Sequence, residues 1–325
     1  MAGIVTLTMN PAVDLSTSVD RVEPLRKLRC HTGRRDPGGG GINVARVIAR
    51  FGADVTAVYP VGGALGQLLQ RLVQDEGIKS LTIPVLGETR EDITVSDAAT
   101  GQQYRFVLPG PALDRAEWTE CLNVFAALRP DFVCASGSLP PGVPDDFYAR
   151  VAKIVAGWGA KFILDSSGAA LNSALEERVY LIKPNLREMR ELVGAALDEQ
   201  GSRIDACRSL IARGAAEIVA LTLGADGALL VTSDRAWQAQ PLPVKPASTV
   251  GAGDSFLGAM VWALTSKMSL EESFRYAVAA GSAALLAPGT ELCRPQDVRD
   301  LLSQVVIQDL PDRRAAAVCG RPSRV

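Results

Sequence analysis

Short apolar runs typical of buried strands alternate along most of the chain with segments whose apolar residues recur at helical spacing. The helical spacing is clear after residue 42, where Val44, Val47 and Phe51 fall on one face and Gly52 stands where a C-terminal cap belongs. Strands are predicted over 4–8, 55–61, 132–135, 162–164, 180–182, 218–223 and 228–231, and further helices over 65–77, 254–265, 270–286 and 295–307. Repeated strand–helix units predict an α/β fold: a doubly wound, mostly parallel sheet flanked by helices, with ligands at the carboxyl ends of the strands.

Two segments lack this alternation. Residues 12–35 are polar with mixed charge, and in residues 82–108 β-branched residues alternate with polar ones without a helical period. We interpret both as insertions that together form a small β-sheet lid of exposed, antiparallel strands. The expected organisation is therefore a single domain over residues 1–308 that carries this lid, followed by a flexible tail over 309–325.

The composition excludes several classes of protein. Lys and Arg number 34 against 36 Asp and Glu, a net charge of −2, so the basic face of a nucleic-acid binder is not expected. The longest uncharged run has 16 residues, too few to span a membrane. Six cysteines without a C-x-x-C pair and no signal peptide indicate a cytoplasmic protein. The single histidine, His31, argues against a His-rich metal site or a Ser-His-Asp triad.

The strongest candidate for chemistry is the run S-T-V-G-A-G-D-S at 248–255, which leads directly into a predicted helix. Gly251 and Gly253 let the backbone approach a ligand closely, and the first amides of the helix, including that of Ala252, have no intrahelical partners. Such a terminus can hold the negative oxygens of a phosphoryl group, and Asp254 could take a proton from an attacking hydroxyl. The alternative is an ordinary turn in which Asp254 caps the helix.

A second candidate is the run K-P-N-L-R-E at 183–188, at the end of a predicted strand. A helix that begins at residue 184 would place Asn185 and Glu188 on one face. An amide and a carboxylate there suit Mg²⁺ shared with nucleotide phosphates. The alternative is a helix start whose first-turn glutamate only favours the helix dipole.

Four further features could bind a substrate or a nucleotide. Four glycines at 38–41 precede a helix that carries Asn43, although they could also form a flexible turn. Asp14 could bind sugar hydroxyls, or it could be an aspartate in an exposed turn. Basic residues of the two insertions could bind a phosphate, or they could be solvated surface charges. These basic residues are Lys27, Arg29, Arg90 and Arg105. The run T-L-G-A-D-G at 222–227 could receive an adenosine or form a simple turn.

Common nucleotide-binding signatures are missing from the sequence. It has no G-x-x-x-x-G-K-[ST] run, no G-x-G-x-x-G after the first strand, and neither H-R-D nor D-F-G. A P-loop NTPase and a protein kinase are thereby excluded, and a nicotinamide dehydrogenase is disfavoured.

In their order along the chain, these motifs resemble the PfkB family of ribokinase-like sugar kinases. The resemblance extends from residue 4 to about 302 and includes the glycine–asparagine run, S-G-S-L-P-P-G at 136–142, K-P-N-x-x-E and T-V-G-A-G-D-S. It implies an ATP-dependent kinase that phosphorylates the 1-hydroxyl of fructose 6-phosphate. Sibling kinases of fructose 1-phosphate or tagatose 6-phosphate carry a lysine where Gly40 stands, whereas N-P-A-V-D at 10–14 is closer to those siblings. A sibling activity and a catalytically silent sugar-phosphate sensor are the alternatives.

The resemblance also implies roles for individual residues. Asp254 corresponds to the base, and Gly251, Ala252 and Gly253 correspond to the anion hole. The implied substrate positions are Asp14, Lys27, Gly39, Asn43, Arg90, Arg105 and Ser138, and the implied nucleotide positions are Lys183, Asn185, Thr222, Gly224 and Gly227. Glu188 would hold Mg²⁺, and K⁺ would lie among Ser248, Val250, Ala284 and Gly289. In this family the β-lid also pairs with that of a second subunit, so a homodimer is implied.

Overall fold

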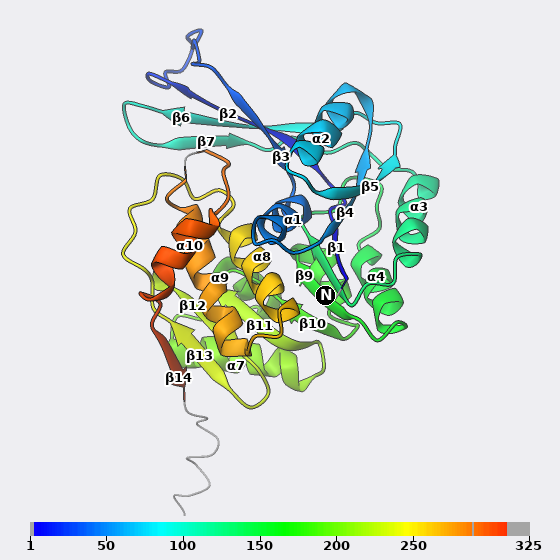
Figure 1. Cartoon of the computed structure of the whole chain (residues 1–325), viewed down its shortest axis with the longest axis vertical. Coiled ribbons are helices and arrows are strands. Elements are labelled where there is room, and N and C mark those ends of the chain that lie inside the picture. Colours follow the sequence, from blue (N-terminus) through cyan, green and yellow to red (C-terminus); the bar gives the residue numbers. More distant parts are fainter. Residues whose placement is uncertain (1–2, 288, 311–325) are drawn as a thin grey trace, which may run out of the picture.

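A mostly parallel sheet runs through the molecule with helices on both faces, as Figure 1 shows for this computed structural model. The structure describes residues 3–287 and 289–310. Within these residues the strand order is β14 (Ile307–Leu310), β13 (Ala236–Ala239), β12 (Ala228–Val231), β11 (Ala216–Thr222), β10 (Val179–Ile182), β9 (Lys161–Asp165), β8 (Phe132–Ser136), β1 (Ile4–Leu7), β4 (Thr56–Val61) and β5 (Lys79–Pro84). Neighbours from β5 to β11 are parallel, and β12, β13 and β14 continue the sheet antiparallel. The predicted fold class is confirmed.

The two faces of this sheet bury separate apolar cores. Because successive side chains in a strand point to opposite faces, Ile4 belongs to one core and Val5 to the other. The first core is covered by α1 (Gly40–Arg50), α2 (Gly63–Asp75), α8 (Ala252–Thr265), α9 (Leu270–Ala284) and α10 (Pro295–Leu302). The second is covered by α3 (Arg115–Ala126), α4 (Phe147–Ala156), α5 (Gly168–Ala174), α6 (Leu186–Val193) and α7 (Gln200–Ala212).

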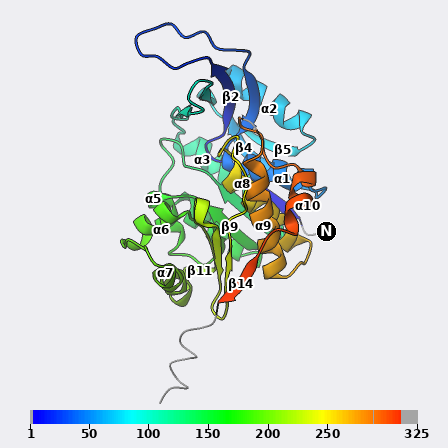
Figure 2. The same cartoon turned by 90° about the vertical axis from the view of Figure 1, so that its left-hand side faces the viewer.

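A second, smaller sheet projects from one end of the main body (Figure 2). Its strand order is β3 (Arg34–Gly38), β2 (Ala12–Val19), β6 (Arg90–Asp97) and β7 (Gln103–Phe106). The expectation of antiparallel strands is wrong for β2 and β6, which pair in parallel. These two strands come from different insertions and are joined through α1, β4, α2 and β5, so no hairpin forces them into opposite directions.

Several predicted boundaries need correction. Residues 82–84 belong to β5 at the edge of the main sheet and not to the second insertion, and they give little core signal because only Ile83 of β5 is buried. The last helix ends at 302 and not 307. Asp309 and Leu310, predicted as the start of a flexible tail, pair with β13 in strand β14. The short strands β13 and β14 were not predicted, and the rest of that tail, 311–325, lies outside the described residues.

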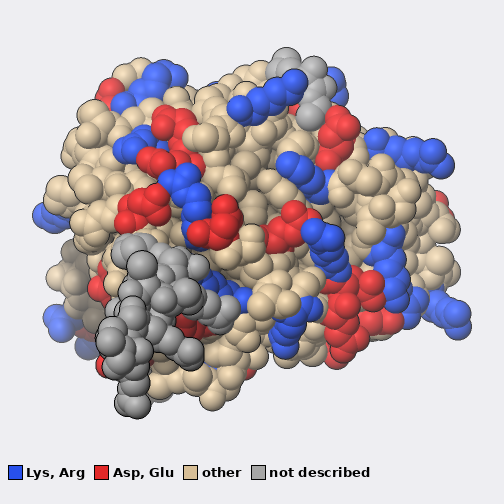
Figure 3. Space-filling model, turned by 90° about the horizontal axis from the view of Figure 1, so that it is seen from below, with Lys and Arg blue, Asp and Glu red and all other residues tan. Residues whose placement is uncertain are grey.

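The surface agrees with the near-neutral composition. On the face seen in Figure 3, acidic and basic side chains are interspersed over the parts of the molecule that the structure describes. Among residues 3–287 and 289–310, no helix has the length and apolar character that crossing a bilayer requires.

Candidate active site

The carboxyl ends of β1, β8, β9 and β10 meet at one edge of the main sheet, where the strand order reverses between β4 and β8 on either side of β1. Such a reversal is where open α/β sheets bind ligands. Polar groups converge there: Asn10 Nδ2 donates to Ser138 Oγ at 3.1 Å, and the carboxylate of Asp165 lies 3.2 Å from Lys183 Nζ and 3.4 Å from Ser136 Oγ. The structure therefore gathers residues from four strand ends at the predicted position.

Helix α8 begins at this edge with backbone amides that no side chain caps. Its N-cap is Gly251, in the left-handed region at φ 75°, and no side chain caps the helix, so the alternative of Asp254 as a capping residue does not hold. A Cβ on Gly251 would lie 2.6 Å from Leu292 Cδ2, which explains the need for glycine. A Cβ on Gly253 would lie 3.4 Å from Lys183 Nζ, so a cation stands beside the open helix start. The first turn, which includes Ala252, thus offers an anion both free N–H groups and a positive charge.

Asp254 lies in this first turn and faces several charged groups. Its Oδ2 accepts a hydrogen bond from Asn43 Nδ2 at 2.9 Å. Burial and the negative charge of Asp165 raise the pKa of Asp254 to about 6. The hydrogen bond from Asn43 and the charges of Lys183 and Arg105 oppose this rise. A carboxylate with a pKa near the working pH is suited to general-base catalysis.

The glycine run before α1 is packed tightly against its neighbours. A Cβ on Gly38 would lie 2.3 Å from Asp14 Oδ1, and a Cβ on Gly40 would lie 2.2 Å from Ser136 Oγ. Gly39, at φ 105°, is the N-cap of α1 and has no side chain to cap the helix. The run is therefore a close backbone approach and not the flexible turn that remained possible from sequence.

Three carboxylates line one face of the small sheet. Asp14 on β2 is in register with Asp36 on β3 and with Asp92 on β6, and paired residues on neighbouring strands point to the same face. Burial and the charge of Asp92 raise the pKa of Asp14 to about 7, and three arginines oppose this effect: Arg105, Arg90 and Arg46.

The basic residues predicted on the lid differ in their surroundings. Arg90 pairs with Asp92 at 3.0 Å and donates to the carbonyls of Asn10 and Leu108, so most of its donors are already used. Arg105 is exposed on β7 and has no side-chain hydrogen bond or ion pair within the described residues, yet its charge lowers the pKa of Asp14. Lys27, like Arg29, is exposed in the connection between β2 and β3, away from any recorded contact with the other candidates in the described part of the chain.

Asn185 and Glu188 form a reciprocal capping box at the start of α6. Glu188 N donates to Asn185 Oδ1, and Asn185 N donates to Glu188 Oε2, both at 2.9 Å. Asn185 Oδ1 and Glu188 Oε2 therefore act as caps at the helix start, as the alternative interpretation expected. Glu188 Oε1 takes no part in this capping box. Asn185 also bridges Thr222 at the end of β11, which brings the adjacent loop alongside. That loop contains Gly224, at the start of a 3₁₀ turn η1 (Gly224–Asp226), and Gly227, whose Cβ would lie 2.1 Å from Ala239 O.

The predicted K⁺ positions form an oxygen-rich loop beside α8. Ser248 Oγ donates to Gly289 O at 2.7 Å and accepts from Val250 N at 3.2 Å. Ala284 is the last residue of α9, and its carbonyl accepts a hydrogen bond from Ala287 N at 3.2 Å, which leaves its second lone pair for a cation. No group of three or more His, Cys, Asp or Glu side chains that could hold a metal occurs within residues 3–287 and 289–310.

Several residues that the structure places at the site were not among the candidates, and three of them bear most on its chemistry. Asp165 directly follows the predicted strand 162–164, a position at which ligands bind, so a signal was present. Arg46 stands one helical turn beyond Asn43 and is buried beneath the site. Asp92 lies beside Asp14 only because of the pairing of β2 with β6, which the sequence pattern does not show.

The chain resembles known proteins over most of its length. A family model described as pfkB family carbohydrate kinase matches residues 5–297. The ATP-dependent 6-phosphofructokinase isozyme 2 of Mycobacterium tuberculosis is 47% identical over 297 residues, which cover 91% of this chain and 87% of that protein. A 1-phosphofructokinase of Xanthomonas campestris is 33% identical over 314 residues, which cover 94% of this chain and 98% of that protein.

A solved structure shows the same fold. The crystal structure of phosphofructokinase-2 from Escherichia coli in complex with potassium matches with a TM-score of 0.90 and 41% sequence identity. The match covers 94% of this chain and 99% of the other. Nearly the whole of each chain is therefore shared, including both sheets of the present structure.

Proposed function

Because the chain belongs to the pfkB family of carbohydrate kinases, as its motifs indicated, we propose that it transfers the γ-phosphoryl group of ATP to the 1-hydroxyl of fructose 6-phosphate, giving fructose 1,6-bisphosphate and ADP. The observation that carries the proposal is Asp254 in the first turn of α8, beside uncapped amides and the ammonium of Lys183. The 47% identity to a 6-phosphofructokinase supports the choice of substrate.

The reaction needs a base and a site for negative charge. The carboxylate of Asp254 accepts the proton of the sugar hydroxyl while that oxygen forms its bond to the γ-phosphorus and the bond to the bridging oxygen of ADP breaks. The amides at Gly251, Ala252 and Gly253 donate to the oxygens of the phosphoryl group during transfer. Lys183, held by Asp165, adds a fixed positive charge.

The small sheet and the glycine run would hold the sugar phosphate. Asp14 and Asn43 offer acceptors and donors to sugar hydroxyls, with Gly39 and Ser138 beside them. The free guanidinium of Arg105 suits the 6-phosphate, and Arg90 supports the wall of the site through Asp92. Lys27 remains a proposed phosphate contact that would require the exposed connection between β2 and β3 to move. The small sheet would thus act as a lid that excludes water.

The residues on the nucleotide side fit ATP and Mg²⁺. Glu188 keeps one carboxylate oxygen outside its capping box, which is enough for Mg²⁺, a cation that retains several waters and shares nucleotide phosphates. When bound, Mg²⁺ would neutralise charge on the transferred phosphoryl group. Lys183 and Asn185 lie on the phosphate side, and the turn at Thr222, Gly224 and Gly227 offers a backbone surface to the nucleoside.

A K⁺ site and a dimer complete the proposal. The oxygens of Ser248, Val250, Ala284 and Gly289 suit a monovalent cation, and the E. coli relative was crystallised in complex with potassium. The small sheet exposes apolar side chains on its strand β7 and just beyond, which supports a homodimer formed through the lid. They are Tyr104, Phe106, Val107 and Leu108.

The sibling activities remain the second candidate, favoured by the 33% identity to a 1-phosphofructokinase. Gly40 argues against them, because a side chain there would meet Ser136 Oγ at 2.2 Å from its Cβ. A silent sensor is less well supported, since both Asp254 and Glu188 are present. Free, buried cysteines among the described residues, such as Cys121 and Cys207, agree with a cytoplasmic location.

A coupled assay of ADP formation tests the proposal. The acceptors would be fructose 6-phosphate, fructose 1-phosphate and tagatose 6-phosphate, each with and without Mg²⁺ and K⁺. We expect the highest kcat/KM with fructose 6-phosphate, a strict requirement for Mg²⁺ and stimulation by K⁺. A preference for either other sugar phosphate would identify a sibling enzyme, and binding of sugar phosphate without any turnover would identify a sensor.

A further inference from the structure

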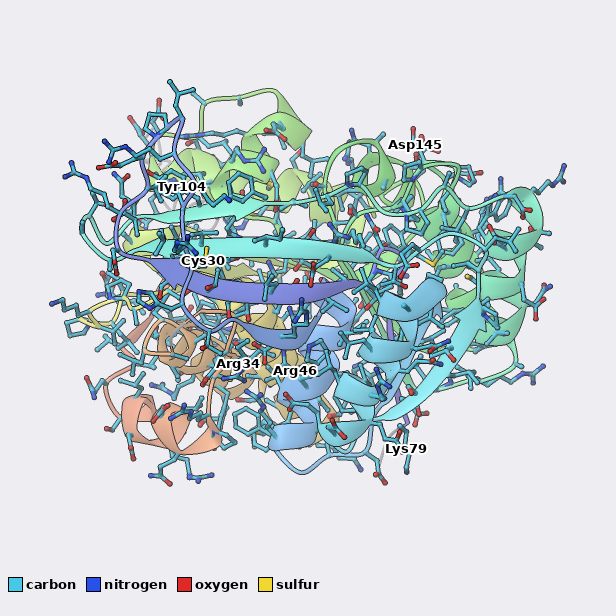
Figure 4. The ribbon with its side chains drawn as sticks, turned by 90° about the horizontal axis from the view of Figure 1, so that it is seen from above. Cys30, Arg34, Arg46, Lys79, Tyr104 and Asp145 are labelled. Atoms are coloured by element: carbon cyan, nitrogen blue, oxygen red, sulfur yellow. The ribbon has the colours of Figure 1, made fainter. Side chains whose placement is uncertain are left out.

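The guanidinium of Arg46 is fully buried on α1, directly beneath the site. Its side chain is 0% exposed, and Figure 4 shows it below the small sheet, near Arg34. Nε and Nη2 donate to Glu76 Oε1 at 3.0 and 2.7 Å. Nη1 donates to Pro37 O at 3.0 Å and to Asn43 Oδ1 at 3.2 Å. A buried charge is expensive unless it is paired and hydrogen-bonded, and this one is both.

These bonds determine which way the amide of Asn43 faces. An amide side chain has one accepting end and one donating end, whereas a guanidinium only donates. With its oxygen turned to Arg46, Asn43 can present only its NH₂ group to Asp254, and Nδ2 donates to Asp254 Oδ2 at 2.9 Å. A continuous chain of contacts thus runs from Glu76, after α2, to the proposed base.

We propose that Arg46, anchored by Glu76, is a positioning residue for the phosphoryl transfer: it holds the Asn43 amide in the one orientation that keeps an N–H donor on the carboxylate of Asp254. The inference rests on the proposed function of Asp254 as the base. Without Arg46 the amide is free to turn over and place its oxygen against the carboxylate. Two facing acceptors would favour a protonated Asp254, which cannot accept the hydroxyl proton.

The other charged groups near Asp254 and near Arg46 do not set the orientation of the Asn43 amide. Asp165, Lys183 and Arg105 act on Asp254 through their charges. At the other end, Asp36 lies 3.7 Å from Arg46, and Arg50 shares Glu76 with it. Among the described residues, Arg46 and Asp254 are the recorded side-chain partners of Asn43.

The same guanidinium ties the glycine run to the base. Its bond to Pro37 O holds the backbone immediately before Gly38 and Gly39, where Asp14 is packed. The charge of Arg46 also lowers the pKa of Asp14. Loss of Arg46 should therefore affect sugar binding as well, so the effect on the base must be read from kcat at saturating sugar phosphate and not from kcat/KM.

The test is the pH dependence of kcat for Arg46→Met. A hydrogen bond to a charged group contributes free energy equivalent to roughly one pKa unit or more. We expect the acidic limb of the kcat profile to move to higher pH by about one unit, with activity recovering at alkaline pH. The matched control is Arg50→Met, which removes another arginine from Glu76 but leaves the bond to Asn43 intact, and its limb should stay in place. An unmoved limb in folded Arg46→Met would overturn the inference.

A double variant separates positioning from a purely structural role. In an Asn43→Ala background the amide is gone, so Arg46→Met should produce no further shift of the limb, whereas an additive shift would contradict action through Asn43. If Arg46→Met does not fold, Glu76→Gln takes its place, because Glu76 anchors Arg46. We expect the acidic limb of its kcat profile to move in the same direction by a smaller amount, and an unmoved limb would contradict the inference. The wild-type assay keeps the two proposals apart: an inactive wild-type protein refutes the function, and an active one with unmoved variants refutes only the role of Arg46.

Discussion

The chemistry of each side chain at this site depends on its neighbours. Asp14 and Asp254 are ordinary carboxyl groups, yet burial beside another aspartate raises the pKa of Asp14 to about 7 and of Asp254 to about 6. In both cases the folded protein binds the proton more tightly than the unfolded chain does. Each ionised carboxylate therefore costs stability as the pH rises from about 4 toward its folded pKa, and the site retains these groups at that expense.

Removing the charge of Asp92 should alter the pH dependence of sugar-phosphate binding. Because Asp92 raises the pKa of Asp14, Asp92→Asn should lower that pKa toward its ordinary value. If ionised Asp14 holds the sugar hydroxyls, the rise in KM on acidification should then begin at lower pH than in the wild type. Titration of the ligand's own phosphate is the same for both proteins and cancels in the comparison. A KM profile that stayed in place, or moved to higher pH, would contradict this role for Asp92.

Arg105 should contribute to the binding of fructose 6-phosphate and have little effect on kcat. Its guanidinium is exposed and has no recorded side-chain partner in the described part of the chain, so it is available to a phosphate. Arg105→Ala should raise the KM for fructose 6-phosphate roughly ten- to hundredfold, as expected for a charge-assisted hydrogen bond, with a smaller change in kcat. Arg299→Ala, at an exposed arginine of helix α10, is the control. An unchanged KM would remove Arg105 from the phosphate site.

Among the elements, the glycine run, helix α1 and strand β2 work as one packed unit. Strand β2 brings Asp14 against the backbone of Gly38, and α1 starts immediately after that contact. Gly38 does not need a left-handed backbone, so the constraint on it is space alone. The position of the Asp14 carboxylate therefore depends on the missing side chain of a residue on the neighbouring strand.

This dependence predicts a specific effect of Gly38→Ala. The new methyl group would lie 2.3 Å from Asp14 Oδ1 and must displace the carboxylate. We expect the KM for the sugar phosphate to rise about tenfold or more in a steady-state assay. In the control Gly3→Ala, the nearest atom to the new Cβ is Pro130 Cα at an ordinary 3.6 Å, so its KM should match the wild type. Equal KM values for the two variants would show that Asp14 does not bind the sugar.

The sequence predicts buried elements better than exposed ones. Buried central strands such as β8 and β11 are dominated by apolar runs, FVCA in β8 and IVAL in β11, so their positions were predicted closely. The edge strands β5 and β14 are largely exposed and lack that signal, which is why residues 82–84 of β5 were assigned to the lid and residues 309–310 of β14 to a tail. Motif residues such as Asp254 were found because their local sequence is distinctive, whereas Arg46 and Asp92 depend on tertiary contacts.

At the scale of the whole molecule, the small sheet is covered on one face only. Its polar face, with Asp14 and Arg105, faces the site, and alternation along β7 sends Tyr104 and Phe106 to the opposite side. Phe106 is 54% exposed and the neighbouring Val107 is 60% exposed. A second copy of the same sheet would bury these side chains, which is the basis for the proposed dimer.

A charge on that apolar face should break the dimer. We expect Phe106→Asp to sediment as a monomer at concentrations at which the wild type is a dimer, because a buried unpaired charge is strongly unfavourable. Leu86→Asp, at another exposed leucine between β5 and β6, is the control and should leave the sedimentation of the wild type unchanged. A Phe106→Asp protein that remained dimeric would place the interface elsewhere.

The account depends above all on Asp254, and one comparison tests it directly: turnover and sugar binding measured on the same Asp254→Asn protein. Asparagine keeps the size of the side chain and an oxygen for Asn43, but it cannot accept the hydroxyl proton. We predict that kcat falls by roughly a thousandfold or more. The Kd for fructose 6-phosphate, measured by calorimetry, should change by less than about tenfold. Turnover within tenfold of the wild type would show that another group is the base.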